Sequence, residues 1–199
     1  MDKLFNVDKK TLLFLLIICF IGLLTGSLFM TVLKNSDKEL ITETVNGFIT
    51  NISSTNSNKM FIESLIINLL LIIFIWVLGI SVIGIPIVIV FIFIKSFLLS
   101  FSLSSFIANF KLKGLVLGII YNFPHNFINL LLFLYLGVYS IRLSTIILNS
   151  VIKRKTIDFK IIMNRYLMVF IFSFVAIIFL SLFEAFATPY LLKIISNVL

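Results

Sequence analysis

The chain has 199 residues, of which 61% are apolar and 12% are charged, and its mean hydropathy is +1.22. Soluble domains contain roughly 45–50% apolar and 25% charged residues, so the polar residues here are too few to cover a folded chain in water. The composition therefore excludes soluble globular and disordered proteins and predicts an integral membrane protein. The net charge of +8 comes mostly from basic residues between the apolar runs, which indicates topology signals rather than a nucleic-acid-binding surface.

Metal and disulfide chemistry is excluded by the counts of its usual ligands. Cys19 is the only cysteine and His125 the only histidine. A disulfide scaffold needs paired cysteines, and a zinc or metalloprotease site needs several His, Cys or acidic ligands. We therefore expect no metal, no cofactor and no catalytic residues, and hence no enzyme.

The first apolar run covers residues 11–33 and follows three lysines. A secretory signal peptide begins in the same way, but this run continues for a full membrane span of roughly 20 residues or more. We expect an uncleaved signal anchor, and a cleaved signal peptide is the alternative.

The only long polar stretch, residues 34–60, is predicted to be a loop that carries an amphipathic helix. A capping box at 36–39 precedes Ile41, Val45 and Phe48, which share one helical face. This helix either lies on the membrane surface or the helix bundle, or docks a partner through that apolar face.

The apolar stretch 64–110 is long enough for two spans and contains a single charge, Lys95. Gly84 suits the position just after a helix and Pro86 the first turn of the next, so we place spans at 61–83 and 86–108. The run before Pro124 is too short to cross a hydrocarbon core of ~30 Å, which predicts a re-entrant or interfacial segment at 109–123.

Pro124 is predicted to open the fourth span, and Pro189 to end the fifth. The expected fold is a single all-α integral membrane domain, 1–199, with one re-entrant or interfacial segment before the fourth span. Its five transmembrane helices are placed at 11–33, 61–83, 86–108, 124–149 and 166–188.

Basic residues orient these spans, because cytoplasmic loops carry an excess of Lys and Arg. The N-terminal lysines and the basic cluster at 150–165 are expected on the cytoplasmic side. The 34–60 loop, the 109–123 segment and the C-terminus are then expected outside the cell membrane.

Charges inside the membrane mark the candidate functional residues, since each costs a few kcal/mol to insert. Arg142 lies near the end of its span and is expected to reach the interface. Lys95 lies deeper, with no acid at its level, and would use backbone carbonyls or a wet cavity. Glu184 and His125 should lie at similar depth, so we predict a hydrogen bond or ion pair from Glu184 to residues 121–126.

The 121–126 joint is the densest polar group in an apolar context. It contains Asn122, Pro124, His125 and Asn126. Because Pro124 removes a backbone donor, the polar side chains either cap a helix start or contact other spans. Elsewhere, small residues such as Gly22 and Gly26 indicate close helix packing within the chain or self-association into a homo-oligomer.

Four motifs in this order resemble the stage II sporulation protein M family of endospore-forming bacteria. They are Trp-Val-Leu-Gly-Ile-Ser-Val-Ile-Gly-Ile-Pro at 76–86, Phe-Ile-Lys at 93–95, Phe-Pro-His-Asn at 123–126, and Leu-Phe-Glu-Ala at 182–185 followed by Pro189. The five-span layout with one long outer loop is also similar. The resemblance covers nearly the whole chain.

This resemblance implies a non-enzymatic scaffold in the membrane that engulfs the forespore. Such a protein anchors two peptidoglycan-degrading partners, stage II sporulation proteins P and D, at the septum, in the mother-cell membrane. The alternative is a small transporter or channel with Lys95, His125 and Glu184 along a polar path, in which the Pro124 joint serves as a broken helix. The small number of polar residues and the lack of an internal repeat argue against that alternative.

Overall fold

The computed structural model describes residues 8–52, 57–154 and 158–198, with side chains except at 48–52, 121, 123–124, 187–189 and 191–198. This part of the chain is all-α, and five helices are long and apolar enough to cross a membrane, as predicted. The elements are α1 (Lys9–Val32), α2 (Asn35–Ile52), α3 (Ser57–Gly79), α4 (Gly84–Asn122), the π-helical turn η2 (Phe123–Phe127), α5 (Ile128–Lys153) and α6 (Phe159–Val198).

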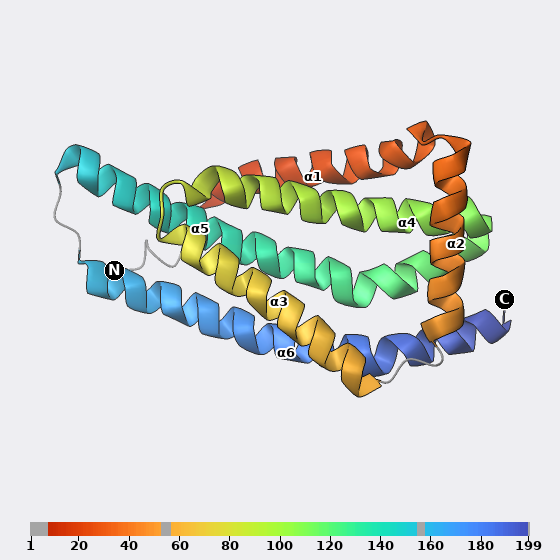
Figure 1. The fold of residues 1–199 in the computed structure, drawn as a ribbon. Helices are drawn as coiled ribbons and strands as arrows, with labels where there is room; N and C mark the ends of the chain where they lie inside the picture. Colours follow the sequence, from red (N-terminus) through yellow and green to blue (C-terminus); the bar gives the residue numbers. More distant parts are fainter. Residues whose placement is uncertain (1–7, 53–56, 155–157, 199) are drawn as a thin grey trace.

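Helix α5 lies at the centre of the bundle. Helix α1 packs along α4, α3 packs along α6, and α5 contacts all four of these helices (Figure 1). Of the most apolar part of α5, 61% is buried, compared with 28% or less in the other spans. Phe133, Leu136 and Val138 form the middle of this core.

Helix α1 begins at a capping residue and packs through glycines. The Asp8 carboxylate accepts hydrogen bonds from the Thr11 hydroxyl at 2.7 Å and the Lys10 amide at 3.2 Å, and the Thr11 bond is the main cause that lowers the pKa of Asp8. Gly22 and Gly26 are buried against α4, where any Cβ would overlap that helix. The two glycines therefore serve packing within the chain.

The turn between α3 and α4 lies a few residues earlier than predicted. Helix α3 ends at Gly79 rather than at 83, and Gly84 begins α4 instead of following α3. A Cβ at Gly84 would overlap the carbonyl of Leu78, so this glycine permits the close approach of the two helix ends. Pro86 lies in the first turn of α4, where a backbone N–H would have no partner within the helix, so the missing N–H of proline costs no hydrogen bond.

Helix α4 reverses direction at Lys111, whose backbone has φ 52° and ψ −125° (Figure 1). Residues 112–122, which we call the returning limb, then run back along the preceding part of the helix. A Cβ at Gly118 would lie 2.8 Å from a methyl group of Leu103 and 3.1 Å from the Cβ of Phe106, so this glycine allows the limb to pack closely. This arrangement matches the prediction of a re-entrant segment before the fourth span.

The returning limb continues through η2 into α5 without a break in the helical chain. Pro124 cannot donate the regular helical hydrogen bond, and a single widened turn absorbs this defect. The second proline behaves differently from expectation. Helix α6 passes through Pro189 and ends at Val198, so the prediction that Pro189 stops the last helix is wrong. Membrane-spanning helices tolerate proline when the freed carbonyl finds another partner.

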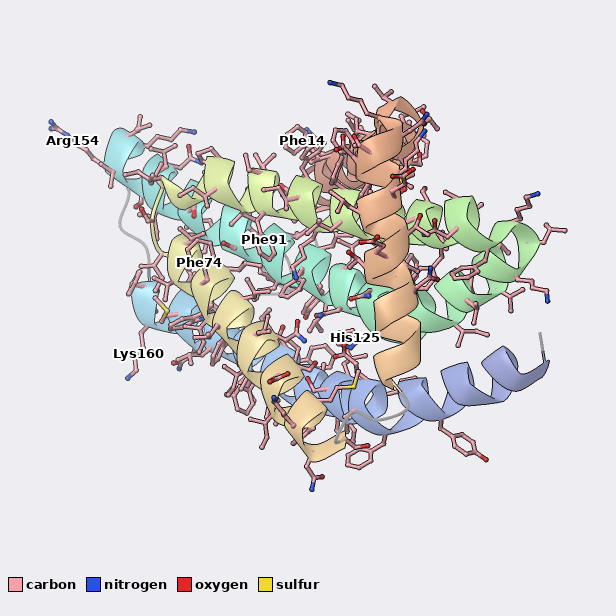
Figure 2. The ribbon with its side chains drawn as sticks, turned by 45° about the vertical axis from the view of Figure 1, so that its right-hand side comes forward. Phe14, Phe74, Phe91, His125, Arg154 and Lys160 are labelled. Carbon is pink, nitrogen blue, oxygen red and sulfur yellow. The ribbon has the colours of Figure 1, made fainter. Side chains whose placement is uncertain are left out.

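Helix α2 lies across one end of the bundle, at a steep angle to the spans (Figure 1). Ile41 and Val45 are half-buried on its inner side, where the Thr42 hydroxyl and the Asn109 side-chain oxygen are 2.5 Å apart. We call this the α2 end of the bundle. Arg154 and Lys160 lie at the opposite end (Figure 2).

Candidate functional site

The structure brings His125 and Glu184 into direct contact, as predicted from their expected depths. The Nε2 atom of His125 lies 2.9 Å from Oε2 of Glu184, and the two side chains are 6% and 18% exposed. His125, which is labelled in Figure 2, belongs to η2 and Glu184 to α6, so the bond joins the joint before α5 to the last helix. A buried carboxylate needs such a partner, because an unpaired charge in apolar surroundings is costly.

The His125–Glu184 pair is part of a larger polar cluster that also includes a third helix. Ser64 of α3 donates a hydrogen bond to the same Glu184 oxygen, and Asn68 donates to Ser64 at 3.2 Å. The Asn129 amide of α5 donates in turn to the Asn68 side-chain oxygen at 2.7 Å. Ser64 also lies within hydrogen-bond distance of the Ser181 hydroxyl, at 3.4 Å. We call these residues the polar cluster: Ser64, Asn68, His125, Asn129, Ser181 and Glu184.

Sequence analysis missed Ser64, Asn68 and Asn129 as members of this cluster. Each is a polar residue in an otherwise apolar helical run, and Asn129 follows His125 by one helical turn. Those two features are the signals that could have found them. All three amide or hydroxyl groups stabilise the packing of α3 against α5 and α6 through interhelical hydrogen bonds.

Two polar atoms of the cluster have no partner among the described residues. They are Nδ1 of His125 and Oδ1 of Asn129, both completely buried. Buried polar atoms in folded proteins nearly always have a hydrogen-bond partner, so each unpaired one indicates a possible position for a ligand or a water molecule.

Lys95 is not a member of the polar cluster, but it lines a cavity of about 450 Å³ that Asn129 of the cluster also lines. Glu184 acts on it electrostatically without forming an ion pair, so the expectation that no acid lies at its level is wrong. Its ammonium nitrogen is 5.3 Å from the ring centroid of Phe133 and 5.9 Å from that of Phe91. These distances allow cation–π attraction, which offsets part of the cost of a charge in this environment. The sequence left open backbone carbonyls or a wet cavity as partners for this lysine, and the structure provides aromatic rings and a cavity.

The cavity lies between α2, α4 and α5 and combines polar and apolar walls. We call it the lysine cavity. It is lined by Ile41, Thr44, Val45, Lys95, Leu98, Leu99, Phe101, Ser102, Ser105, Phe106, Asn122, Asn126, Asn129, Leu130 and Phe133.

Of the two interpretations that the sequence left open for the joint, the structure supports the contact with another span and shows no capping hydrogen bond from Asn122. The Asn122 amide donates to the Gly118 carbonyl at 2.9 Å, and Asn126 donates to the Asn122 side-chain oxygen at 3.2 Å. Asn122 therefore bonds the backbone of the preceding turn without capping a helix start, Asn126 bonds the Asn122 side chain, and His125 contacts another span. The side chain of Pro124 lies outside the described residues.

The remaining candidates with described side chains lie at two separate places. Gly84 and Pro86 form the tight turn at the end opposite α2. Ile41 and Val45 contribute to the wall of the lysine cavity, and the side chain of Phe48 falls outside the described ones. Over the described chain, no group of three or more His, Cys, Asp or Glu side chains could hold a metal ion.

Comparison with known proteins places the whole arrangement in a family. The family model described as Stage II sporulation protein M matches residues 12–189, which is most of the chain. Neither the curated proteins nor the solved structures gave a match. The matched region contains the five apolar helices, the joint at η2 and the polar cluster. This multi-pass membrane protein therefore belongs to the stage II sporulation protein M family.

Proposed function

We propose that the protein is a non-enzymatic membrane scaffold that anchors peptidoglycan-degrading partners at the septal and engulfing membrane. Family membership gives the coarser role, that of a sporulation-related membrane protein. The observation that supports a scaffold is α2, which lies across one end of the bundle with one side against it. On the opposite side of α2, described side chains such as Glu39 and Leu40 are exposed and accessible to another protein.

The exposed side of α2 is the partner-binding surface in this proposal. Glu39, Leu40 and Glu43 are exposed there, and Leu40 is 63% exposed. The apolar stripe that the sequence offered for docking includes Ile41 and Val45, which instead line the lysine cavity. An acidic surface around one apolar side chain fits a basic partner surface with a small apolar pocket.

The partners in this proposal are those that the resemblance implied, stage II sporulation proteins P and D. Peptidoglycan lies outside the membrane, so α2 must lie on that side to hold enzymes that cut it. The positive-inside rule gives the same orientation, because Arg154 and Lys160 lie at the opposite end. The N-terminus is then cytoplasmic, and the protein is in the mother-cell membrane.

A non-enzymatic role is supported by the way the polar groups are used. Glu184 accepts hydrogen bonds from His125 and Ser64, and these bonds connect three helices. Groups that hold helices together in this way support a structural role rather than catalysis or proton transfer.

Charge reversal on α2 tests the partner surface. A Glu39→Lys/Glu43→Lys variant should lose its hydrolase partners on co-purification from sporulating cells, while its membrane abundance stays unchanged. The matched control is Glu63→Lys, because Glu63 is 62% exposed near the start of α3 and forms only a surface pair with Lys59. Equal retention of the partners by the α2 variant and the control would refute docking through this surface.

Deletion of the gene tests the cellular role. The deletion strain should form the septum and then stall in engulfment, because the partners would no longer be held at the membrane. The purified protein should not cut peptidoglycan. Normal engulfment and normal spores in the deletion strain would contradict the proposal.

A transporter or channel is the second candidate, and the lysine cavity is the observation that favours it. The cavity contains Lys95, but its described lining includes neither His125 nor Glu184. The three residues therefore do not line one common path there, which weakens this candidate. Flux of an ion or solute through the purified protein in liposomes, abolished by Lys95→Gln, would favour transport over the scaffold.

A further inference from the structure

The lysine cavity contains a charged side chain that has no ion-pair partner among the described residues, and the acidic side chain that acts on it, Glu184, does so only at longer range. Among the described residues that line it, Lys95 is the only ionisable one. Among the described residues no carboxylate lies within ion-pair distance of its ammonium group, and its close neighbours are the rings of Phe91 and Phe133. A cation in the membrane interior is normally paired, so this site favours a ligand that brings a negative charge.

The polar side of the cavity also has unused hydrogen-bonding capacity. Oδ1 of Asn129 is completely buried without a partner, and the residue is 4% exposed. This oxygen can only accept, so the ligand must offer a donor such as a hydroxyl group. The amide nitrogens of Asn122 and Asn126 each carry two hydrogens and use one in the described bonds, which leaves donors for an anion.

The apolar side of the cavity favours an amphiphile over a small free anion. A volume of about 450 Å³ lies within the range of roughly 300–1,000 Å³ that is typical of sites for organic ligands. Leu98 lines the cavity and is 51% exposed, and Ile94, one turn earlier, is exposed without lining it. The wall beside Lys95 therefore continues onto the outer, apolar face of α4, where a hydrocarbon chain can lie.

We propose that the lysine cavity binds an anionic amphiphile whose head group carries a phosphate ester and a free hydroxyl. The phosphate pairs with Lys95 and accepts from the amides of Asn122 and Asn126. The head-group hydroxyl donates to Oδ1 of Asn129, and the hydrocarbon chain leaves over Leu98. The same head-group chemistry has two sources, a membrane phospholipid and a soluble glycerol phosphate, and the apolar wall favours the phospholipid.

The test is a binding titration with the full-length protein in a neutral detergent. Short-chain phosphatidylglycerol should bind, and short-chain phosphatidylcholine should bind at least about tenfold more weakly. Lys95→Gln should reduce the affinity for phosphatidylglycerol by about tenfold or more, as expected for the loss of a charged hydrogen bond. The matched control is Lys59→Gln, which removes a lysine that is exposed at the α2 end. Equal affinity of wild type and Lys95→Gln, or of the two lipids for the wild type, would overturn the proposal.

Two further ligands test the role of the head-group hydroxyl and whether the ligand is a phospholipid or a soluble phosphate. Phosphatidylmethanol has the same charge without a hydroxyl, so it should bind the wild type more weakly than phosphatidylglycerol; equal binding would overturn the role of Asn129. Glycerol phosphate has no hydrocarbon chain, and binding as tight as that of phosphatidylglycerol would overturn the lipid as the source. If Lys95→Gln cannot be purified, Lys95→Arg keeps the charge and must retain selectivity for phosphatidylglycerol over phosphatidylcholine.

Discussion

Glu184 has two hydrogen-bond donors around one carboxylate oxygen, and this fixes what a substitution there does. Glu184→Gln keeps an oxygen for His125 and Ser64, so it should be tolerated. Glu184→Leu removes the oxygen that accepts both bonds and leaves the two buried donors unpaired, which costs about 1–3 kcal/mol each. We expect Glu184→Leu to lower the amount of protein in the membrane and its thermal unfolding temperature in detergent.

Glu63→Leu is the control for Glu184→Leu, because Glu63 is exposed and should tolerate the change within about 0.5 kcal/mol. If Glu184→Gln were as unstable as Glu184→Leu, the negative charge would be the stabilising feature, and hydrogen bonding would not be enough.

The contact between His125 and Glu184 could be predicted because both residues were placed at the same depth from the ends of their spans. The participation of Ser64 and Asn68 in the cluster could not be predicted in this way. The depth of a residue in the membrane is only one coordinate, and a contact also depends on how each helix is rotated about its axis. The residues around Asn68 are so uniformly apolar that they do not show which side of α3 faces inward. The nearly continuous hydrophobicity of these spans removes the periodic signal that a soluble helix would give.

At the scale of helices, Gly26 and Gly47 make a matched pair. A Cβ at Gly26 would overlap the Phe97 carbonyl of α4, whereas one at Gly47 meets nothing within 4 Å. Both substitutions to alanine improve helix propensity, by about 1 kcal/mol. Gly26→Ala should nevertheless destabilise the protein, because overpacking typically costs about 1–3 kcal/mol.

Thermal unfolding of the two purified variants in the same detergent measures this difference. Gly47→Ala should be neutral or slightly stabilising. If Gly26→Ala were as stable as Gly47→Ala, α1 could move away from α4 at no cost in free energy. That result would contradict the close packing of the two helices.

The helical elements were largely predictable from length and hydropathy, but their ends were not. The re-entrant segment follows from an apolar run too short to cross the membrane, whereas its sharp reversal is at Lys111, a residue type that rarely has positive φ. Pro189 was expected to end α6 because proline breaks soluble helices. The helix continues because proline removes only one backbone hydrogen bond, and the carbonyl freed in this way can bond to another group.

For the whole molecule, the charges at the two ends predict the orientation in the membrane. In a Cys19→Ala background, a cysteine at Glu39 should react with an impermeant thiol reagent in intact cells, and one at Lys160 should not. Both positions are exposed, so the difference reports the side of the membrane and not burial. Reaction at 160 with protection at 39 would reverse the orientation and remove α2 from the side of the cell wall.

The polar cluster also has a consequence for how the chain is made. Ser64 and Asn68 belong to α3, whereas their partners Asn129 and Glu184 come from helices that the ribosome synthesises later. Nascent chains that stop before α6 would already contain the Asn68–Asn129 pair, but they would carry Ser64 and His125 into the bilayer without Glu184. The cluster is therefore complete only when the last helix is inserted, which favours the docking of α6 against the helices that precede it.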